Sequence, residues 1–405
     1  MSDLPTSRRG FLGYAALAAA TPILTEAHFA YAADKTATTG ASGLTAPDMK
    51  VRHAAPEGMV LINANENPLG PCKAACEAIA AIAPMGGRYD LYGETEKLTK
   101  TFAAQNGLKE DYVSVYAGSS EPLHYTVLAF TSPEHGFVTA DPSYEAGMVA
   151  AHVSGAKISK VPLTPGFEHD LKAMVAADPT AGVIYICNPN NPTGTLTRKE
   201  EIVWALDNKP KGAVLLVDEA YIHLSDQPSV LDMVAADKDL IVLRTFSKIY
   251  GMAGIRCGLA LARPDLLAKL RPYGQNAMPI TGSAAANVSL LQADLVPTRK
   301  AIIGDTRRDT LAWLVSNGYK PIGHSQSNCF MIDTGRDGKA VMAAMKAKGV
   351  LIGRTWPIWP QAVRVSVGTP VEMAKFKLAF HEVMSGPALA MAEPMGPHTH
   401  FPQYS

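Results

Sequence analysis

The chain has 405 residues, of which 47% are hydrophobic and 18% are charged. That is ample for a buried core and predicts one large domain plus a smaller one. Lysine plus arginine and aspartate plus glutamate number 37 each, so no net field favours nucleic acid or an anionic membrane. The five cysteines have no metal-ligand spacing and are expected to pack in the interior, so no metal site is predicted.

The first part of the chain has the layout of an export signal. Arg8-Arg9 precede an uncharged apolar run from Phe11 to Leu24, and Ala30-Tyr31-Ala32 has a small-x-small cleavage pattern. The run is about 15 residues long, which is short for a membrane span. The segment resembles a twin-arginine signal, although a disordered apolar tail is the plainer alternative.

That resemblance implies removal of residues 1–32, with cleavage near Ala32. It also implies the twin-arginine export machinery as a partner, an exported and periplasmic mature protein, and no stable membrane insertion after cleavage. Residues 33–56 are expected to be a flexible leader.

Beyond the leader, apolar runs of strand length alternate with helical stretches. This pattern is typical of an α/β protein with a mostly parallel sheet. We expect an N-terminal arm at 57–84 and a large domain at 85–295. Its predicted strands are Tyr112–Tyr116, Gly136–Ala140, Gly182–Cys187, Ala213–Val217, Leu240–Thr245 and Cys257–Ala262. Its predicted helices are Glu121–Phe130, Arg198–Leu206 and Thr281–Leu291.

A smaller α+β domain is expected over 296–385, beginning with a long helix from about Thr298 to Ser316. Its predicted strands are Asn328–Asp333, Val350–Gly353 and Val363–Val367. Residues 386–405 are expected to form a poorly ordered tail.

Polar groups follow several predicted strands of the large domain, where ligands bind in open α/β sheets. They are the loop Asn188–Gly194, Asp218, the pair Ser247-Lys248, and Arg256. Taken singly, each has an ordinary explanation as a turn, a helix cap or a solvated side chain. Their joint occurrence in this order indicates a binding site.

The joint chemistry of these groups is that of a site for an aldehyde cofactor with a pyridine ring. A lysine forms a Schiff base with the aldehyde, and a carboxylate keeps the ring nitrogen protonated. An amide and a phenol stabilise the ring oxygen, while an arginine and hydroxyls hold a phosphate. The residues that supply these needs are Lys248, Asp218, Asn191, Tyr221, Arg256, Thr245 and Ser247.

The sequence resembles the fold-type-I pyridoxal-phosphate aminotransferases of class I/II over roughly residues 57–384, and within them the histidinol-phosphate aminotransferases. The motifs that carry the resemblance are LINANENPLGP at 61–71, RYDLYGE at 88–94, AGSSE at 117–121, DPSYEA at 141–146, NPNNPTGT with its preceding Asn188, VDEAY at 217–221, TFSKIYGMAGIRCG at 245–258 and VRVSVGTP at 363–370.

The resemblance implies a pyridoxal 5′-phosphate cofactor and a role for each matching residue. Lys248 would hold the cofactor and move the proton, and Asp218 would pair with the pyridinium nitrogen. Tyr144 would stack on the ring, whose oxygen Asn191 and Tyr221 would contact. The phosphate would be held by Ser119, Ser120, Thr245, Ser247 and Arg256. The serines at 119 and 120 depart from the acidic or small residues usual there.

The resemblance also implies a homodimer, because Tyr89 would reach the phosphate from the neighbouring subunit. The proline usual after this tyrosine is missing, which leaves Tyr92 as a rival. Arg364 would bind the anionic end of the substrate. Asn65 either lines the site or is a turn residue, and Trp356, with Trp359, forms either an aromatic wall for the substrate or packing of the small domain.

The expected activity is transfer of an amino group from an amino acid or amine to a 2-oxo acid such as 2-oxoglutarate. A pyridoxal-phosphate oxidase, decarboxylase or lyase on the same scaffold is the alternative. A non-catalytic binding protein would not need the set Lys248, Asp218 and Arg256. Because histidinol phosphate should remain cytosolic, an exported enzyme is predicted to prefer an ordinary α-amino acid, aromatic ones included.

Overall fold

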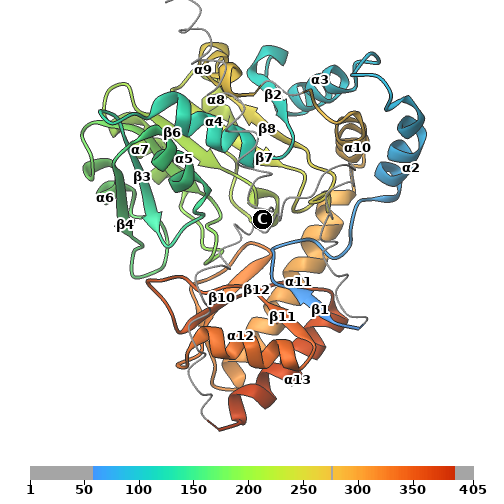
Figure 1. The fold of residues 1–405 in the computed structure, drawn as a ribbon, viewed down its shortest axis with the longest axis vertical. Coiled ribbons are helices and arrows are strands. Elements are labelled where there is room, and N and C mark those ends of the chain that lie inside the picture. The colour runs from blue at the N-terminus through green and yellow to red at the C-terminus, as the bar shows by residue number, and fades with distance from the viewer. Residues whose placement is uncertain (1–57, 275–276, 388–405) are drawn as a thin grey trace, which may run out of the picture. The chain divides into compact units, whose positions relative to one another are not determined.

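A seven-stranded sheet organises the larger part of the chain in the computed structural model, which describes residues 58–274 and 277–387 (Figure 1). Its strand order is β2-β8-β7-β6-β5-β3-β4. The strands are β2 (Val113–Tyr116), β3 (Gly136–Asp141), β4 (Ile158–Pro162), β5 (Ala181–Cys187), β6 (Val214–Asp218), β7 (Leu240–Thr245) and β8 (Gly258–Leu261). The predicted signal at 1–32 and leader at 33–56 lie outside the described residues, as does the predicted tail from residue 388 onward.

The middle strands of this sheet are apolar because helices cover both of its faces. Every residue of β5, β6 and β7 is buried, which accounts for their continuous apolar sequences. Strand β4 was not predicted: it lies at the edge, is only partly buried and has no continuous apolar run. Strand β8 was predicted, but it runs antiparallel to both neighbours.

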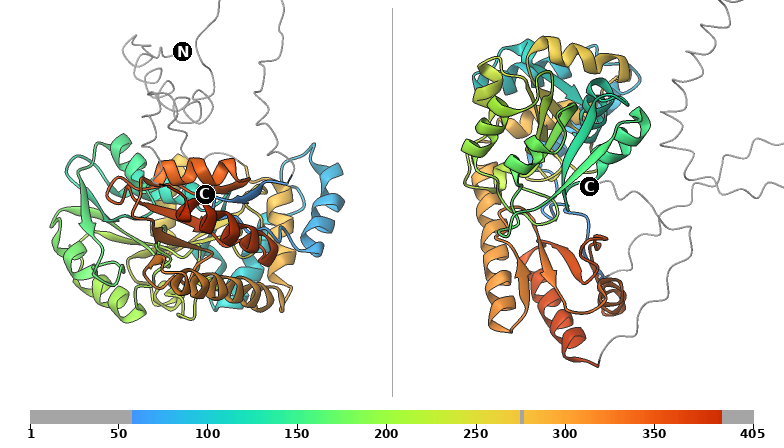
Figure 2. Two further views of the ribbon diagram at one scale, coloured as in Figure 1. Left: turned by 90° about the horizontal axis from the view of Figure 1, so that it is seen from below. Right: turned by 90° about the vertical axis from the view of Figure 1, so that its left-hand side faces the viewer.

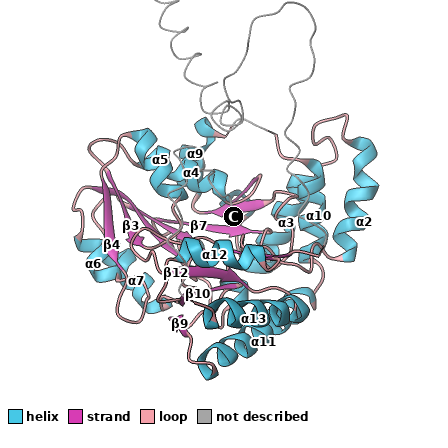
Figure 3. Cartoon of the chain, turned by 60° about the horizontal axis from the view of Figure 1, so that its bottom comes forward, coloured by secondary structure: helices cyan, strands magenta, loops and turns pink. Residues whose placement is uncertain are grey.

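The helices of this part lie in two layers. Figure 3 shows α4 and α5 on one side of the sheet and α6 and α7 on the other. The helices are α4 (Ser120–Phe130), α5 (Ala146–Ser154), α6 (Leu171–Ala176), α7 (Lys199–Asn208), α8 (Leu231–Ala235) and α9 (Pro264–Leu270). Short 3₁₀ turns are η1 (Ala83–Met85), η2 (Glu110–Tyr112), η3 (Ile222–Leu224) and η4 (Arg271–Tyr273). The predicted helices at 121–130 and 198–206 are confirmed to within two residues.

A second, antiparallel sheet has the order β12-β10-β9. Its strands are β9 (Lys320–Ile322), β10 (Cys329–Asp333) and β12 (Ala362–Ser366), and its helices are α11 (Leu295–Ser316), α12 (Gly338–Ala347) and α13 (Pro370–Ser385). Helix α11 runs from the end of the molecule that carries α10 (Ile280–Leu290) down to this sheet (Figures 1 and 2). The start of helix α13 is well defined, because the N-cap Thr369 and Glu372 form a capping box and Pro370 is the first helical residue.

The N-terminal arm ties the two sheets together. Its strand β1 (Val60–Ile62) pairs in parallel with β11 (Val350–Ile352), and the chain then rises to α2 (Lys73–Ile82) and α3 (Glu94–Asn106). Both helices pack on α10 (Ile280–Leu290), the predicted helix at 281–291. Strand β11 was predicted at 350–353, and it pairs with the arm and not with the sheet β12-β10-β9.

The described residues belong to one compact unit. The finer division into an arm at 57–84, a large domain at 85–295 and a small domain at 296–385 therefore stays a prediction. Within 58–274 and 277–387, no helix is both long enough and apolar enough to cross a bilayer.

Candidate active site

The predicted polar groups meet at one edge of the seven-stranded sheet. Strand register places Cys187 beside Asp218, and Gly258 beside both Thr245 and Tyr116. Strand β2 runs parallel to β7, because both are antiparallel to β8, and therefore also ends at this edge. The expected clustering of the polar groups is confirmed, and the antiparallel direction of β8 places Arg256 just before that strand instead of after it.

Asp218 is a buried carboxylate surrounded by neutral donors. It is the last residue of β6; Tyr185 Oη donates to its Oδ2 at 3.0 Å, and the Ala220 amide donates to its Oδ1 at 3.1 Å. Burial raises the pKa of Asp218 to about 6, although these hydrogen bonds act in the opposite direction. Among the described residues no cation forms an ion pair with it. The site therefore suits a ligand that brings a positively charged N–H.

Lys248 is a buried amine in the turn that follows β7. Its Nζ lies 5.5 Å from the centroid of the Tyr221 ring, and only 3% of the residue is exposed. Burial, and then the charge of Arg364, lowers the pKa of Lys248 to about 8. A larger fraction of this amine is therefore neutral and nucleophilic near neutral pH than of an exposed lysine.

Hydroxyls and a guanidinium form a linked group beside Lys248. Thr245 Oγ1 donates to Ser247 Oγ at 3.0 Å, and Arg256 Nη1 donates to the same Ser247 Oγ at 3.3 Å. Arg256 itself has a left-handed backbone with φ of 64°. This group can bind the oxygens of a phosphate.

The start of α4 completes this phosphate cradle. Gly118 has φ of 95°, and a Cβ built there would lie 2.0 Å from Nη2 of Arg256, so only glycine fits. Ser119 and Ser120 follow, where the first amides of α4 are not used within the helix. The Ser120 side chain is close enough to Tyr144 to act against the burial that raises the pKa of this phenol. Both predicted serines and Tyr144 are therefore brought together.

Asn191 and Tyr221 are oriented by residues from distant parts of the chain. Arg364 Nη1 donates to Asn191 Oδ1 at 2.8 Å, and Asn65 Nδ2 donates to Tyr221 Oη at 3.1 Å. Since each oxygen already accepts a hydrogen bond, the amide Nδ2 of Asn191 and the phenol O–H of Tyr221 remain as donors. Two donors of this kind suit a ring oxygen that carries negative charge.

Asn65 proves to be more than a turn residue. It has φ of 54°, which asparagine tolerates, and it is completely buried. Its backbone N–H donates to Ser366 Oγ at 2.7 Å, while its side chain reaches Tyr221. The arm thereby connects the second sheet to the site. The adjacent Glu66 is close enough for its charge to raise the pKa of Lys248.

Arg364 is a buried cation without a carboxylate partner in the described part of the chain. Its Nη2 donates to the Asn63 carbonyl at 2.8 Å, and its Nε has no partner among these residues. Burial lowers the pKa of Arg364. A guanidinium in this condition favours an incoming anion.

Trp356 is 1% exposed, and the centroid of its ring is 4.4 Å from Cζ of Arg354 and 5.6 Å from Cζ of Arg364. This favours the packing interpretation of Trp356 over an open aromatic wall. Trp359 forms an isolated bridge with Trp356 and packs edge-on against Phe167.

Tyr89 and Tyr92 lie apart from the buried site residues of their own chain. They occupy the loop between η1 and α3 and are 83% and 50% exposed. A side chain this exposed contributes little to its own subunit's interior, so the role of Tyr89 across a subunit boundary stays a prediction.

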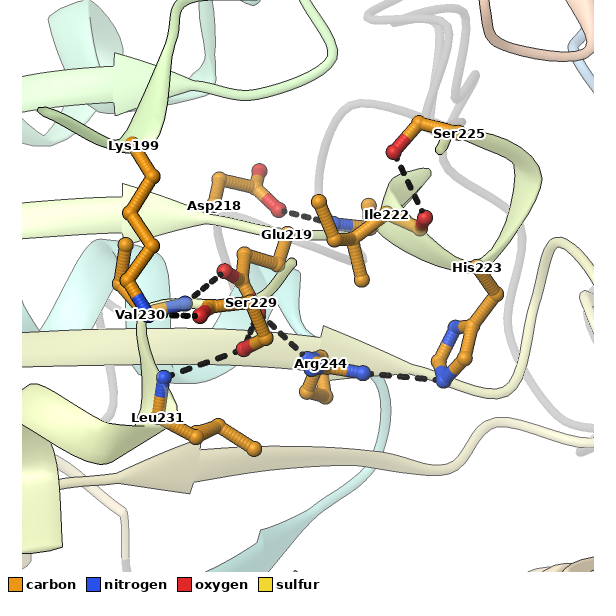
Figure 4. A network of polar contacts seen from close by, with 11 residues as sticks. Lys199, Asp218, Glu219, Ile222, His223, Ser225, Ser229, Val230, Leu231 and Arg244 are labelled. Atoms are coloured by element: carbon orange, nitrogen blue, oxygen red, sulfur yellow. Dashed lines mark hydrogen bonds and ion pairs between the residues drawn. The ribbon is translucent and has the colours of Figure 1, made fainter. Parts of the chain in front are cut away.

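The sequence reasoning missed several residues that the fold brings to the site. Tyr185 looks like a core residue of an apolar strand, yet its hydroxyl reaches Asp218. Glu145 forms an ion pair with Arg354 at 2.5 Å. Glu219 and Arg244 form a buried pair behind Asp218 (Figure 4). Only one sequence signal could have indicated the pair of Glu219 with Arg244. Side chains alternate along a strand, so the polar Arg244 points to the opposite face of β7 from Thr245.

The comparisons with known proteins show the family of this chain. The family "Aminotransferase class I and II" matches residues 57–377. The chain is 33% identical over 338 residues to an aromatic amino acid aminotransferase from Cutibacterium acnes, covering 82% of this chain and 94% of the relative. It is 31% identical over 340 residues to a histidinol-phosphate aminotransferase from Moorella thermoacetica, covering 81% and 86%.

A solved structure has the same fold. It is the histidinol-phosphate aminotransferase from Sinorhizobium meliloti in complex with pyridoxal-5′-phosphate, with a TM-score of 0.75 and 24% identity, covering 81% of this chain and 91% of that one.

Proposed function

We propose that this chain, which belongs to the class I and II aminotransferase family, uses an ordinary α-amino acid as its donor, aromatic ones included, in preference to histidinol phosphate. The enzyme is an aminotransferase, which moves an amino group from an amino acid or amine to a 2-oxo acid. We propose 2-oxoglutarate as an acceptor.

The residues of the site fit the family's cofactor, pyridoxal 5′-phosphate. When bound, the cofactor supplies an electron sink for charge that develops on the donor α-carbon. Asp218 would meet the ring nitrogen, and Lys248 would hold the cofactor covalently. The buried carboxylate of Asp218, which lacks an ion-pair partner in the described residues, is the observation that supports this fit.

The protein's own residues then position the donor and move one proton. Arg364 would bind the donor carboxylate and so fix the α-carbon within reach of Lys248. The Lys248 amine, once released from the cofactor, would take the α-proton on Nζ and return it, for which a pKa of about 8 is suitable. The burial of both residues excludes water from this exchange.

The preference for a donor whose anionic group carries a single charge rests on how the site arginines are paired. Arg256 belongs to the phosphate cradle, and Arg354 is held by Glu145, whereas Arg364 has no carboxylate partner among the described residues. One uncompensated guanidinium matches one carboxylate. The phosphate of histidinol phosphate carries close to two charges at neutral pH and would need a second free cation.

The test is kcat/KM for phenylalanine, tyrosine and histidinol phosphate with 2-oxoglutarate as the acceptor. We expect the aromatic amino acids to be preferred. A clear preference for histidinol phosphate would restore the biosynthetic role and overturn the proposed donor.

We also propose a homodimer with shared sites. The loop that carries Tyr89 exposes apolar side chains, with Leu91 72% exposed and Met85 43% exposed, as expected of a surface that meets a second copy. Mixing Tyr89→Ala subunits with Lys248→Ala subunits should restore activity, because one site of the hybrid has both residues intact. If Tyr89 acts within its own subunit, no activity will return.

Export to the periplasm by the twin-arginine machinery is a further proposal. It is supported by Arg8-Arg9 and the apolar run behind them, which lie outside the described residues. Replacing both arginines with lysine should leave a folded, cofactor-loaded precursor inside the cell. Unchanged export of that variant would refute the proposal.

A further inference from the structure

The rim of the site contains an ion pair that joins two distant segments. Glu145 precedes α5 directly, and Arg354 lies between β11 and β12. Arg354 Nη2 and Glu145 Oε2 are 2.5 Å apart, and the two side chains are 29% and 34% exposed. The pair is therefore accessible from solvent, unlike the buried groups around Lys248.

Arg354 belongs to the same structural group as Arg364. The two guanidiniums lie on one indole ring, that of Trp356, and the Arg364 backbone N–H donates to the Arg354 carbonyl at 3.2 Å. The charge of Arg354 also contributes to lowering the pKa of Arg364 and acts against the rise in that of Tyr144. Arg354 thus lies within electrostatic reach of the place where the donor binds.

Glu145 is adjacent to Tyr144, whose predicted place is over the cofactor ring. Its backbone is the N-cap of α5, where the helix dipole favours a negative charge. A donor with a second negative charge would meet Arg354, whose charge is already compensated, and the anionic Glu145 beside it. It would have to displace Glu145 from Arg354 and then remain close to a like charge.

We propose that Glu145 is a specificity-determining residue, which neutralises Arg354 at the rim and thereby disfavours substrates with a second negative charge, whether on a phosphate or on a second carboxylate. This rests on the proposed function, in which Arg364 alone receives the donor carboxylate. The same penalty falls on 2-oxoglutarate relative to a 2-oxo acid with a neutral side chain. An exposed ion pair contributes little to stability, so selectivity is the property that Glu145 should change most.

The experiment compares the wild-type holoenzyme with Glu145→Gln, which keeps the shape and removes the charge. The donor half-reaction is followed by the visible absorbance of the cofactor, with phenylalanine and with histidinol phosphate. The ratio of kcat/KM for histidinol phosphate to that for phenylalanine should rise about tenfold, and the value for phenylalanine should stay within about twofold. The dissociation constant of glutarate, measured by calorimetry on the holoenzyme, should fall by a similar factor.

A second variant tests the pair from the other side. Arg354→Gln leaves Glu145 without its partner, so the ratio should fall below that of the wild type. In the double variant Glu145→Gln/Arg354→Gln, the rise in the ratio that Glu145→Gln alone produces should disappear. The matched control is Glu382→Gln, which removes the exposed partner of Lys348 on α13 and should leave the ratio unchanged.

The outcomes separate the two proposals. If the wild type prefers phenylalanine but Glu145→Gln leaves both the ratio and glutarate binding unchanged, the role of Glu145 is refuted and the proposed function stands. If the wild type itself prefers histidinol phosphate, the proposed function fails, and with it the role of Glu145.

Discussion

Asp218 and Glu219 are consecutive carboxylates at the end of β6, and both are almost completely buried, yet their surroundings differ (Figure 4). Glu219 Oε2 accepts from Arg244 Nε at 2.8 Å and from Ser229 Oγ at 2.7 Å, and its Oε1 accepts from the Val230 amide at 2.9 Å. In the described structure, Asp218 accepts hydrogen bonds only from neutral donors.

The network around Glu219 extends to His223. Arg244 Nη1 lies 2.9 Å from His223 Nε2, which must therefore accept, and burial together with this cation lowers the pKa of His223 well below its usual range. The imidazole is thus neutral, and the network holds one positive and one negative charge. A compensated pair of this kind fixes the turn after β6 without inviting a ligand.

The two carboxylates serve different purposes: Glu219 stabilises the fold, and Asp218 belongs to the functional site. The charge of Glu219 is satisfied within the protein, while the charge of Asp218 costs free energy until a cation arrives. Buried, uncompensated charges are a feature of functional sites. Replacing the carboxylate of each neighbour by an amide should therefore have opposite consequences: mainly a loss of activity at Asp218 and mainly a loss of stability at Glu219.

The largest effect is expected from Asp218→Asn. The change removes the anion that would face the ring nitrogen, and kcat/KM should fall at least about a hundredfold. The apoenzyme should meanwhile become more stable. Burial raises the pKa of Asp218 from 3.8 to about 6, which corresponds to roughly 3 kcal/mol of destabilisation above pH 6.

The sign of this stability gain provides its own check. The gain should be full above pH 6, should shrink as the pH falls, and should vanish below 3.8, where the carboxyl of the wild type is protonated in both states. Urea denaturation of the two apoenzymes at pH 8 and pH 5 measures it. A loss of stability at pH 8 would contradict the view that Asp218 is uncompensated.

Glu219→Gln should have the opposite profile. It leaves Arg244 buried without its counter-charge, and the free energy of unfolding should fall by about 3–5 kcal/mol. Activity per folded enzyme should fall much less than in Asp218→Asn. The control is Glu382→Gln, whose exposed pair with Lys348 should contribute less than about 1 kcal/mol. Equal unfolding midpoints for Glu219→Gln and the wild type would refute the comparison.

The same contrast explains what the sequence could predict. Lys248 and Asp218 lie at or just past the ends of parallel strands, so their place at one sheet edge could be inferred from local patterns and the geometry of parallel sheets, whereas Arg256 precedes the antiparallel β8. The reach of Asn65 to Tyr221, and the pair of Glu145 with Arg354, could not, because they depend on how distant segments pack. The partnership of β1 with β11 was missed for the same reason, since three apolar residues do not reveal their partner.

The pH dependence of cofactor attachment tests the second uncompensated group. Since the pKa of Lys248 is lowered to about 8, the amine is protonated below that pH and neutral above it. The rate at which apoenzyme binds pyridoxal 5′-phosphate covalently should fall about tenfold for each pH unit below 8 and level off above it. Visible absorbance after mixing gives this rate between pH 6 and 10.

A matched variant identifies the cause of the lowered pKa. The charge of Arg364 is the second contribution after burial, so Arg364→Gln should move the midpoint above 8. If the wild type itself shows a midpoint near the ordinary lysine value of 10.5, the burial of Lys248 does not have the electrostatic consequence inferred for it.

The smallest effect is expected at Tyr185, the residue that the sequence concealed within an apolar strand. Its hydroxyl donates to Asp218 Oδ2 at 3.0 Å and stabilises the charged form of that carboxylate. Tyr185→Phe keeps the ring, which stacks on Phe137, and removes only this donor, so the fold should be unchanged. A hydrogen bond to a charged group contributes about 1.5 kcal/mol or more, and kcat should fall about tenfold. Because the pKa of Asp218 would rise further, the loss should be greater at pH 6 than at pH 8. Unchanged kcat at both pH values would mean that Tyr185 supports the site by packing alone, and that Asp218 does not depend on its hydroxyl.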